Sequence, residues 1–221
     1  MKKERNRSRA ELSVMAVIGA VGLTFALYLC LAPQFRVTEV HKCATTNENW
    51  QTGPLTGTET AVQEFIPQKP ELIEIAVWVN RQNDLAGEGR LRLTVFDAEG
   101  TVYAVCERAL AELVTNNWEW FAVNATLTVG ETYYFSLETV DGGDVYPTAV
   151  YRPLHLDRIE ENIQYFYGGE LIGGASAACQ YRYRLPLTVT EGCIYMTFCL
   201  FFAFAAGELI CRIMRRARGQ V

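Results

Sequence analysis

The sequence predicts an all-β domain, a sandwich or a barrel, carried between two transmembrane helices. Three observations support this fold class. Apolar segments near both ends of the 221-residue chain are long enough to cross a bilayer. Between them lie about eight or nine short segments in which apolar and polar residues alternate. Turn residues recur at intervals of roughly ten residues, which is typical of antiparallel sandwiches and barrels rather than of parallel sheets.

The first apolar segment, residues 12–32, is expected to be an uncleaved membrane anchor. It holds no charged residue and follows a basic tail, residues 1–11. A cleaved signal peptide is the alternative, but its apolar core is usually only about 7–15 residues and a small-residue cleavage site would follow. The stretch from Leu27 to Cys30 also lacks the small residue that precedes the cysteine of a lipoprotein signal.

The second apolar segment, residues 191–213, is expected to be a second span before a basic tail, residues 214–221. From Cys193 onward its only charged residues are Glu208 and Arg212, an i,i+4 pair near its end. Nine of the twenty Lys and Arg lie in the tails or at this end. Positive charge marks cytoplasmic segments, so both termini are expected inside and residues 34–191 outside.

Residues 34–191 hold 11 Lys and Arg against 22 Asp and Glu, a net charge of −11. This acidity disfavours nucleic acid and anionic surfaces as partners and suits a solvated domain held off a negative membrane. Three of the seven cysteines, Cys43, Cys106 and Cys179, lie in this region. An odd number allows one bridge at most, and small buried thiols are the simpler expectation.

Residues 33–58 are polar and are expected to lead in from the membrane, with the β-domain over 59–187. In the second expected strand, Ile73, Ile75, Val77 and Val79 share one face. Asp97 to Gly100 suits a hairpin turn, and residues 109–114 suit one or two helical turns. The expected strands are Thr60–Ile66, Leu72–Val79, Arg90–Asp97, Thr101–Arg108, Trp118–Val123, Thr132–Thr139, Thr148–Arg152, Ile163–Tyr167 and Ala177–Arg184.

Aromatic residues crowd the segment from Asn116 to Glu138. If Phe121 points inward, Trp118 and Trp120 point outward on the same strand. By the same alternation Tyr134 points outward while Tyr133 and Phe135 point inward. If the two strands pair, Trp118, Trp120 and Tyr134 form one ligand-binding patch, and Trp78 is a further candidate ligand-binding residue on the same grounds. Such rings stack on sugars or on a protein partner, unless a loop or the other sheet covers them.

The order of features from Gln63 to Tyr183 resembles a known family. The matching residues are Gln63 and Phe65, GRLRLTVFDAEG at 89–100, Trp120-Phe121, Gly130 with TYYFSLE after it, and YFYGGELIGGASAACQYRY at 165–183. They resemble the extracytoplasmic jelly-roll modules of bacterial membrane proteins, which are similar to carbohydrate-binding modules. The resemblance implies a bacterial plasma-membrane protein with a binding or spacer module. The expected function of this membrane-anchored module is to recognise a cell-envelope glycan or to support polysaccharide assembly. The alternative is a structural or accessory subunit that binds another membrane protein through its sandwich and its spans.

No catalytic residue, metal ligand or cofactor is expected. Asp141, Asp144 and Asp157 offer too few oxygens for calcium, and His41 and His155 lack partners at zinc-ligand spacing. The acidic residues show no local motif for glycoside hydrolysis. Within the spans, small residues four apart favour close helix packing, either between the two spans or with a partner; the pairs are Ala16 and Ala20, Gly22 and Ala26, and Ala203 and Gly207.

Overall fold

The computed structural model describes residues 2–32, 36–43, 45–81, 88–142, 146–154 and 163–217, without the side chains of residues 2–10 and 215. The chain divides into two compact units. One contains both ends of the chain, Met1–Val37 and Pro186–Val221, and the other is Thr38–Leu185.

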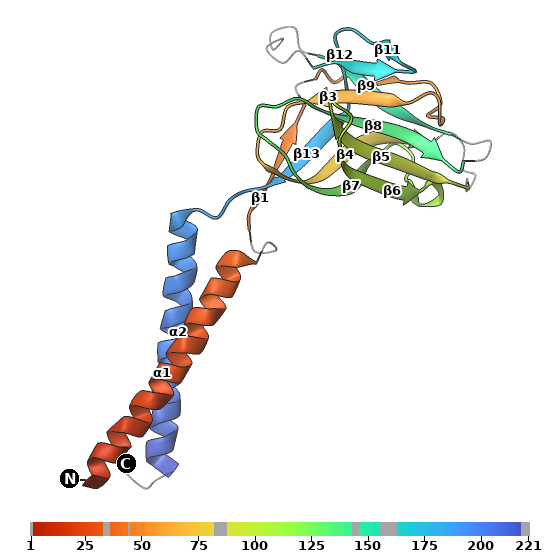
Figure 1. Cartoon of the computed structure of the whole chain (residues 1–221). Coiled ribbons are helices and arrows are strands. Elements are labelled where there is room, and N and C mark those ends of the chain that lie inside the picture. The colour runs from red at the N-terminus through yellow and green to blue at the C-terminus, as the bar shows by residue number, and fades with distance from the viewer. Residues whose placement is uncertain are drawn as a thin grey trace. The chain divides into compact units, whose positions relative to one another are not determined.

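The first unit is a pair of helices, α1 (Lys2–Leu31) and α2 (Val189–Ala217), which lie side by side and run in opposite directions (Figure 1). Their segments Glu11–Leu31 and Val189–Met214 are each long and apolar enough to cross a membrane. A Cβ added to Gly22 would lie 2.5 Å from Ala203 Cβ, so the small residues there permit close packing. The expected i,i+4 pair is formed, with Arg212 Nε 3.7 Å from Glu208 Oε2.

The second unit contains two antiparallel sheets in a sandwich-like arrangement (Figure 1). Among the described residues one sheet has six strands. In spatial order they are β11 (Glu170–Leu171), β10 (Tyr165–Tyr167), β3 (Ala61–Phe65), β8 (Tyr133–Val140), β5 (Arg90–Asp97) and β6 (Val102–Ala109).

The other sheet has seven strands in the described part of the chain. Its main path is β1 (Thr38–Lys42), β13 (Cys179–Arg184), β4 (Glu71–Arg81), β9 (Pro147–Pro153) and β12 (Ala175–Ala177). Two further strands join from the side: β2 (Trp50–Gln51) pairs with β9, and β7 (Asn117–Thr126) pairs with β4.

The core lies between the inner faces of the two sheets. Phe65 of β3 stacks on Tyr181 of β13, with ring centroids 5.0 Å apart, so side chains from both sheets meet directly. Leu91, Leu93 and Val95 are fully buried, as their alternation predicts. Full burial of a large apolar side chain stabilises a fold by about 1.5–3 kcal/mol, so this shared core holds the two sheets together.

A buried glutamine also links the sheets. Gln63 of β3 is fully buried, and its Oε1 accepts hydrogen bonds from Ala177 N at 2.6 Å and Ser176 Oγ at 3.1 Å. Its Nε2 donates to Glu64 O at 2.6 Å and to Gln164 O at 3.3 Å. Both ends of the amide are therefore paired, as a buried amide requires.

Two sequence expectations are wrong in detail. A β-bulge between Leu72 and Glu74 reverses the alternation at the start of β4, so Leu72 is fully buried while Ile73 is only half-buried. The expected polar lead-in also contributes strands, because β1 pairs with β13 and β2 pairs with β9. The strand β1 was not predicted because Thr38–Lys42 is largely polar, and an exposed edge strand needs few apolar residues.

The helical turn and the hairpin are as expected. Leu110–Glu112 forms a short 3₁₀ helix after β6. The turn between β5 and β6 places Gly100 at φ 82°, a backbone conformation that glycine adopts without strain. Its amide donates to Asp97 O at 3.1 Å and closes the turn.

Candidate functional site

The outer face of the seven-stranded sheet carries three tryptophans. The register of β4 against β7 places Trp78 opposite Trp118, and Ala76 opposite Trp120. The Trp78 and Trp118 rings contact edge to face, with centroids 5.2 Å apart and planes at 63°. All three tryptophans are half-buried, so part of each remains open to solvent. We refer to Trp78, Trp118 and Trp120 as the tryptophan face.

Cations and amides hold these rings in place. Arg182 of β13 places its guanidinium carbon 4.1 Å from the Trp120 ring centroid, within the range of a cation–π contact. Arg152 of β9 lies 5.5 Å from the Trp78 ring, whose Nε1 donates to Asn116 Oδ1 at 3.1 Å. The tryptophan face is therefore a preorganised aromatic surface edged by hydrogen-bonding groups.

The guanidinium groups are themselves oriented by acceptors. Arg182 is paired with Glu74 of the neighbouring strand β4. Arg152 Nε donates to Asn49 Oδ1 at 2.7 Å. A guanidinium group that is held in this way directs its remaining N–H donors toward a ligand in a defined orientation.

Tyr134 does not join the tryptophan face. It lies on β8, which pairs with β3 and β5 of the other sheet, and not with β7. Its ring stacks on Phe96, with centroids 5.6 Å apart, and burial followed by the nearby Glu64 charge raises its pKa. The patch of Trp118, Trp120 and Tyr134 required β7 to pair with β8. In the structure β7 pairs with β4 instead, so the three rings do not share one face. A ligand-binding role for Tyr134 apart from the tryptophans stays a prediction.

A groove lined by both charged and apolar side chains adjoins Trp120. It lies between β6 and β7, has a volume of about 360 Å³, and is lined by Val105, Cys106, Glu107, Arg108, Glu112, Trp120, Phe121 and Ala122. Two side chains of β6 donate across it to backbone carbonyls of β7: Cys106 Sγ to Ala122 O at 3.2 Å and Arg108 Nη1 to Trp120 O at 3.0 Å. We call this hollow the β6–β7 groove.

Sequence reasoning missed a buried acid beside this groove. Glu119 is only 4% exposed, and its Oε1 accepts a hydrogen bond from Val114 N at 2.9 Å. Arg108 Nε lies 3.8 Å from its Oε2. The available signal was its place in the alternation, since Glu119 shares the inward side of β7 with Phe121. Its bonds show that it orders the loop before β7 and orients Arg108.

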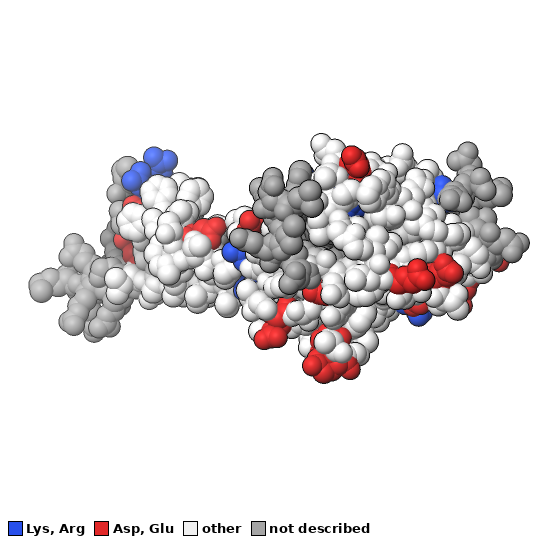
Figure 2. All heavy atoms as spheres, turned by 90° about the horizontal axis from the view of Figure 1, so that it is seen from above, with Lys and Arg blue, Asp and Glu red and all other residues white. Residues whose placement is uncertain are grey.

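Acidic side chains are dispersed over the β-domain rather than gathered at one site. Figure 2 shows several separate groups of them on the face that it presents. On the six-stranded sheet, Arg90 and Arg92 both pair with Glu107, at 2.9 Å and 2.8 Å. Arg90 also pairs with Asp141 at 2.6 Å. Asp141 is thus engaged in an ion pair, and Asp144, Asp157 and His155 lie outside the described residues.

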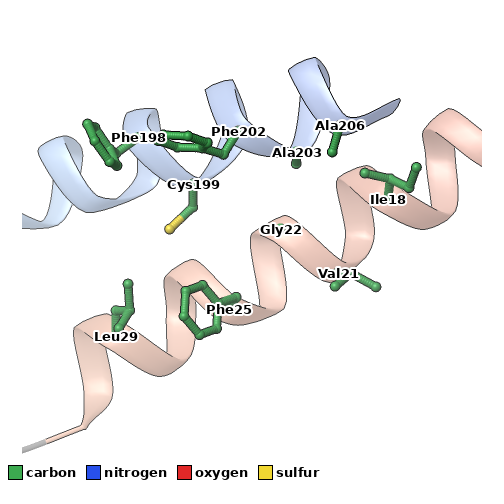
Figure 3. Close-up of a pocket in the computed structure, with 10 residues that line it drawn as sticks. All are labelled: Ile18, Val21, Gly22, Phe25, Leu29, Phe198, Cys199, Phe202, Ala203 and Ala206. Carbon is green, nitrogen blue, oxygen red and sulfur yellow. The ribbon is translucent and has the colours of Figure 1, made fainter. Parts of the chain in front are cut away.

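No group of three or more His, Cys, Asp or Glu within the described ranges is placed to hold a metal ion. The remaining hollow of note is apolar and lies between α1 and α2, with a volume of about 470 Å³. Figure 3 shows Phe25 and Leu29 facing Phe198 and Cys199 across it. Such a surface suits acyl chains or another apolar helix.

Comparison with known proteins gives little further help. No protein-family model matches the chain, and no curated protein matches it. The CBM22-1 xylan-binding domain of Xyn10C from Paenibacillus barcinonensis is 18% identical at a TM-score of 0.30, over 51% of this chain and 80% of that domain. A structure of the Gt strain of infectious bursal disease virus is 11% identical at a TM-score of 0.29, over 69% of this chain and 37% of the viral chain.

A third similar structure comes from a study of carbohydrate-binding modules of the β-sandwich superfamily. It is 9% identical at a TM-score of 0.26, over 51% of this chain and 54% of that one. This chain therefore spans about half of that protein and little more than a third of the viral one. Similarity at this level assigns neither a family nor a ligand to this chain.

Proposed function

We propose that this chain is a membrane-anchored, non-catalytic protein that binds a cell-envelope glycan. The observation that carries the proposal is the tryptophan face: two cross-strand rings and a third that also lines the β6–β7 groove. Sugar rings present apolar C–H faces that stack on flat aromatic rings. Their hydroxyl groups need donors and acceptors nearby, which Arg182, Asn116 and the groove acids supply.

The proposal includes a location. Two apolar helices, basic tails and an acidic domain between them support a bacterial plasma-membrane protein with both termini cytoplasmic and residues 34–191 outside. The antiparallel packing of α1 and α2 agrees with this orientation. The resemblance seen in the sequence implies a jelly roll, and this assignment of the β-domain stays a prediction.

A glycan array probed with the full-length chain in lipid nanodiscs tests the proposal. We expect binding to a subset of bacterial cell-envelope polysaccharides and no binding to nucleic acid. Signals should be independent of moderate salt, because ring stacking is not a charge interaction. An array without any hit at micromolar protein, with the β-domain shown to be folded by thermal melting, would reject the glycan assignment.

A second function is favoured by one observation, the outer edge of the six-stranded sheet. In the described part of the chain β6 pairs only with β5, and its Val102, Tyr103 and Val105 are 55%, 41% and 55% exposed. Cys106 and Arg108 contact β7, but the first half of β6, with its exposed apolar side chains, suits the addition of a strand from a membrane-protein partner. In this alternative the chain is an accessory subunit.

Photo-cross-linking in native membranes separates the two functions. A photoreactive amino acid at Val105 should give a discrete adduct if β6 docks a partner. The same group at Ala98, in the β5–β6 turn, is the matched control and should give none. Adducts at both positions, or at neither, would count against the docking of a partner along β6.

A further inference from the structure

Two of the three cysteines of the β-domain lie together in the structure. Cys43 Sγ is 3.1 Å from Cys179 Sγ, although 136 positions separate them in the sequence. Cys43 follows the last residue of β1, and Cys179 is the first residue of β13. The ladder between these strands ends with Lys42 opposite Gln180, so Cys43 and Cys179 occupy the next step of the same register.

This placement meets the geometric needs of a disulfide. Directly opposed residues of antiparallel strands have Cα atoms about 4.5–5.5 Å apart. Disulfides span Cα separations of about 4.4–6.8 Å. The two sulfur atoms therefore need to approach by only about 1 Å to bond, and neither strand has to move out of register.

We propose that Cys43 and Cys179 form a disulfide that fixes β1 to β13. The inference takes from the proposed function only the extracytoplasmic position of residues 34–191, where disulfides persist. It does not depend on glycan binding. Cys106 stays a thiol, because its Sγ lies across the β6–β7 groove and donates to Ala122 O at 3.2 Å.

The oxidant is a disulfide of an extracytoplasmic thiol oxidoreductase or of a small thiol. Cys43 is the half-buried member of the pair, so its thiolate attacks the oxidant and forms a mixed disulfide, releasing one oxidant thiolate. The thiolate of Cys179 then attacks Cys43 Sγ and releases the second. The two cysteines lose two protons and two electrons, and the oxidant disulfide is reduced to two thiols.

The surroundings support this order of events. Cys179 is 3% exposed, and its Sγ donates to Tyr181 Oη at 3.3 Å. Burial raises the pKa of the Cys179 thiol, so it forms a thiolate less readily than an exposed cysteine. Cys179 thus suits the second, intramolecular step, in which the proximity of Cys43 Sγ compensates for its low reactivity.

The bond has a mechanical role in the sheet. Four of the five residues of β1 are exposed, so little buried apolar surface holds this strand. Among the described strands, β1 is paired with β13 alone. It is also the first strand after α1 in the sequence. A covalent link at its end keeps an otherwise weakly held edge strand in the sheet.

The test is mass spectrometry on the full-length chain from native membranes, with thiols alkylated before lysis and digestion without reductant. We expect a linked peptide pair that contains Cys43 and Cys179, and an alkylated Cys106. Cys43→Ser should abolish the linked pair, and the matched control Cys106→Ser should retain it. Alkylated Cys43 and Cys179 in wild-type membranes, or a bridge that contains Cys106, would overturn the proposal.

A second measurement separates the chemistry of the pair from its location in the cell. The purified, reduced chain in nanodiscs is titrated with oxidised glutathione, and its melting is followed by tryptophan fluorescence. We expect the same bridge, and a Tm about 5–10 °C higher than that of the reduced chain. Bridge formation here but not in cells would place the domain in a reducing compartment and reject the proposal, whereas failure in both would reject the pairing itself.

Discussion

At the scale of single residues, alternation along a strand is the most reliable signal in this sequence. It correctly directs Phe121 and Phe135 into the core, and Trp118 and Trp120 to the outer side. It fails at Ile73, because a bulge inserts one residue and shifts the pattern. No local property of the sequence shows where such a bulge occurs, since it depends on the partner strand.

Gln63 is the residue whose replacement should harm stability most clearly. Gln63→Leu leaves Ala177 N buried without the acceptor that Gln63 supplies, at a cost of about 1–3 kcal/mol, while Ser176 Oγ can still donate to Ala177 O at 3.2 Å. We expect the Tm of the β-domain to fall by about 5–10 °C. Gln180→Leu, at a half-buried outer position of β13, is the matched control and should shift the Tm by much less. Equal Tm shifts for the two variants would contradict the proposed stabilising role of Gln63 between the sheets.

At the scale of elements, hairpins were predictable and sheet membership was not. The turn chemistry of Asp97 to Gly100 locates β5 and β6 within one residue of their observed bounds. The connection after β7 carries no sign that the chain crosses to the other sheet, so the sequence left open whether β7 pairs with β8, and in the structure these strands lie in different sheets. Tyr134 was separated from the tryptophans for this reason alone.

Asp97, in the β5–β6 turn, should make a pH-dependent contribution to the stability of the folded β-domain. Burial raises the pKa of its carboxyl, but bonds from Thr101 N, at 2.8 Å, and Tyr103 Oη, at 3.1 Å, outweigh this and leave the pKa below its usual value. A lowered pKa in the folded state adds stability above the unfolded pKa of about 3.9, which is lost as pH falls through the folded value. Asp97→Ala should therefore lower the Tm at pH 7, with a difference that shrinks below about pH 4.

Thermal melts of both proteins from pH 7 to pH 2.5 measure this effect. Glu99→Ala, in the same turn, is the control and should show a smaller difference at pH 7. A difference between wild type and Asp97→Ala that stays constant across the acid range would show that the charge of Asp97 has no part in the turn.

Gly22 lies at a close approach of the two helices. Gly22→Leu should separate α1 from α2, because even a Cβ would lie 2.5 Å from Ala203 Cβ and 3.3 Å from Cys199 O. Gly19→Leu is the matched control, since a Cβ there meets no atom within 4 Å. Cysteines introduced at Met15 and Gly207, which are in contact in the structure, report the pairing by oxidative cross-linking in membranes. Cross-linking that survives Gly22→Leu would contradict this packing.

At the scale of the whole molecule, the distribution of apolar and charged residues predicted the division of the chain better than the alternation within strands did. The two apolar segments, the basic tails and the acidic middle define the two units before any strand is assigned. The candidate site was only partly predictable. Its tryptophans were identified from alternation, and the buried Glu119 could have been found in the same way. The β6–β7 groove depends on how strands of two different sheets pack, and the contact of Cys43 with Cys179 joins residues 136 positions apart.

The proposed topology can be checked on sealed cells. With both termini cytoplasmic, an impermeant protease added outside should remove the acidic β-domain and leave the basic tails protected. An epitope inserted in the turn at Ala98 should be lost, while one at either terminus should be retained until the cells are lysed. Loss of a terminal epitope from intact cells would reverse the orientation.

The central claim is that a glycan stacks on the tryptophan face, and paired alanine variants test it most directly. For a glycan identified on the array, titration calorimetry with the full-length chain should show that Trp120→Ala weakens binding about tenfold or more, a loss of about 1.4 kcal/mol. Tyr134→Ala, on the outer face of the other sheet, should leave the Kd unchanged. Unchanged affinity in folded Trp120→Ala, or an equal loss in Tyr134→Ala, would contradict the assignment of the site.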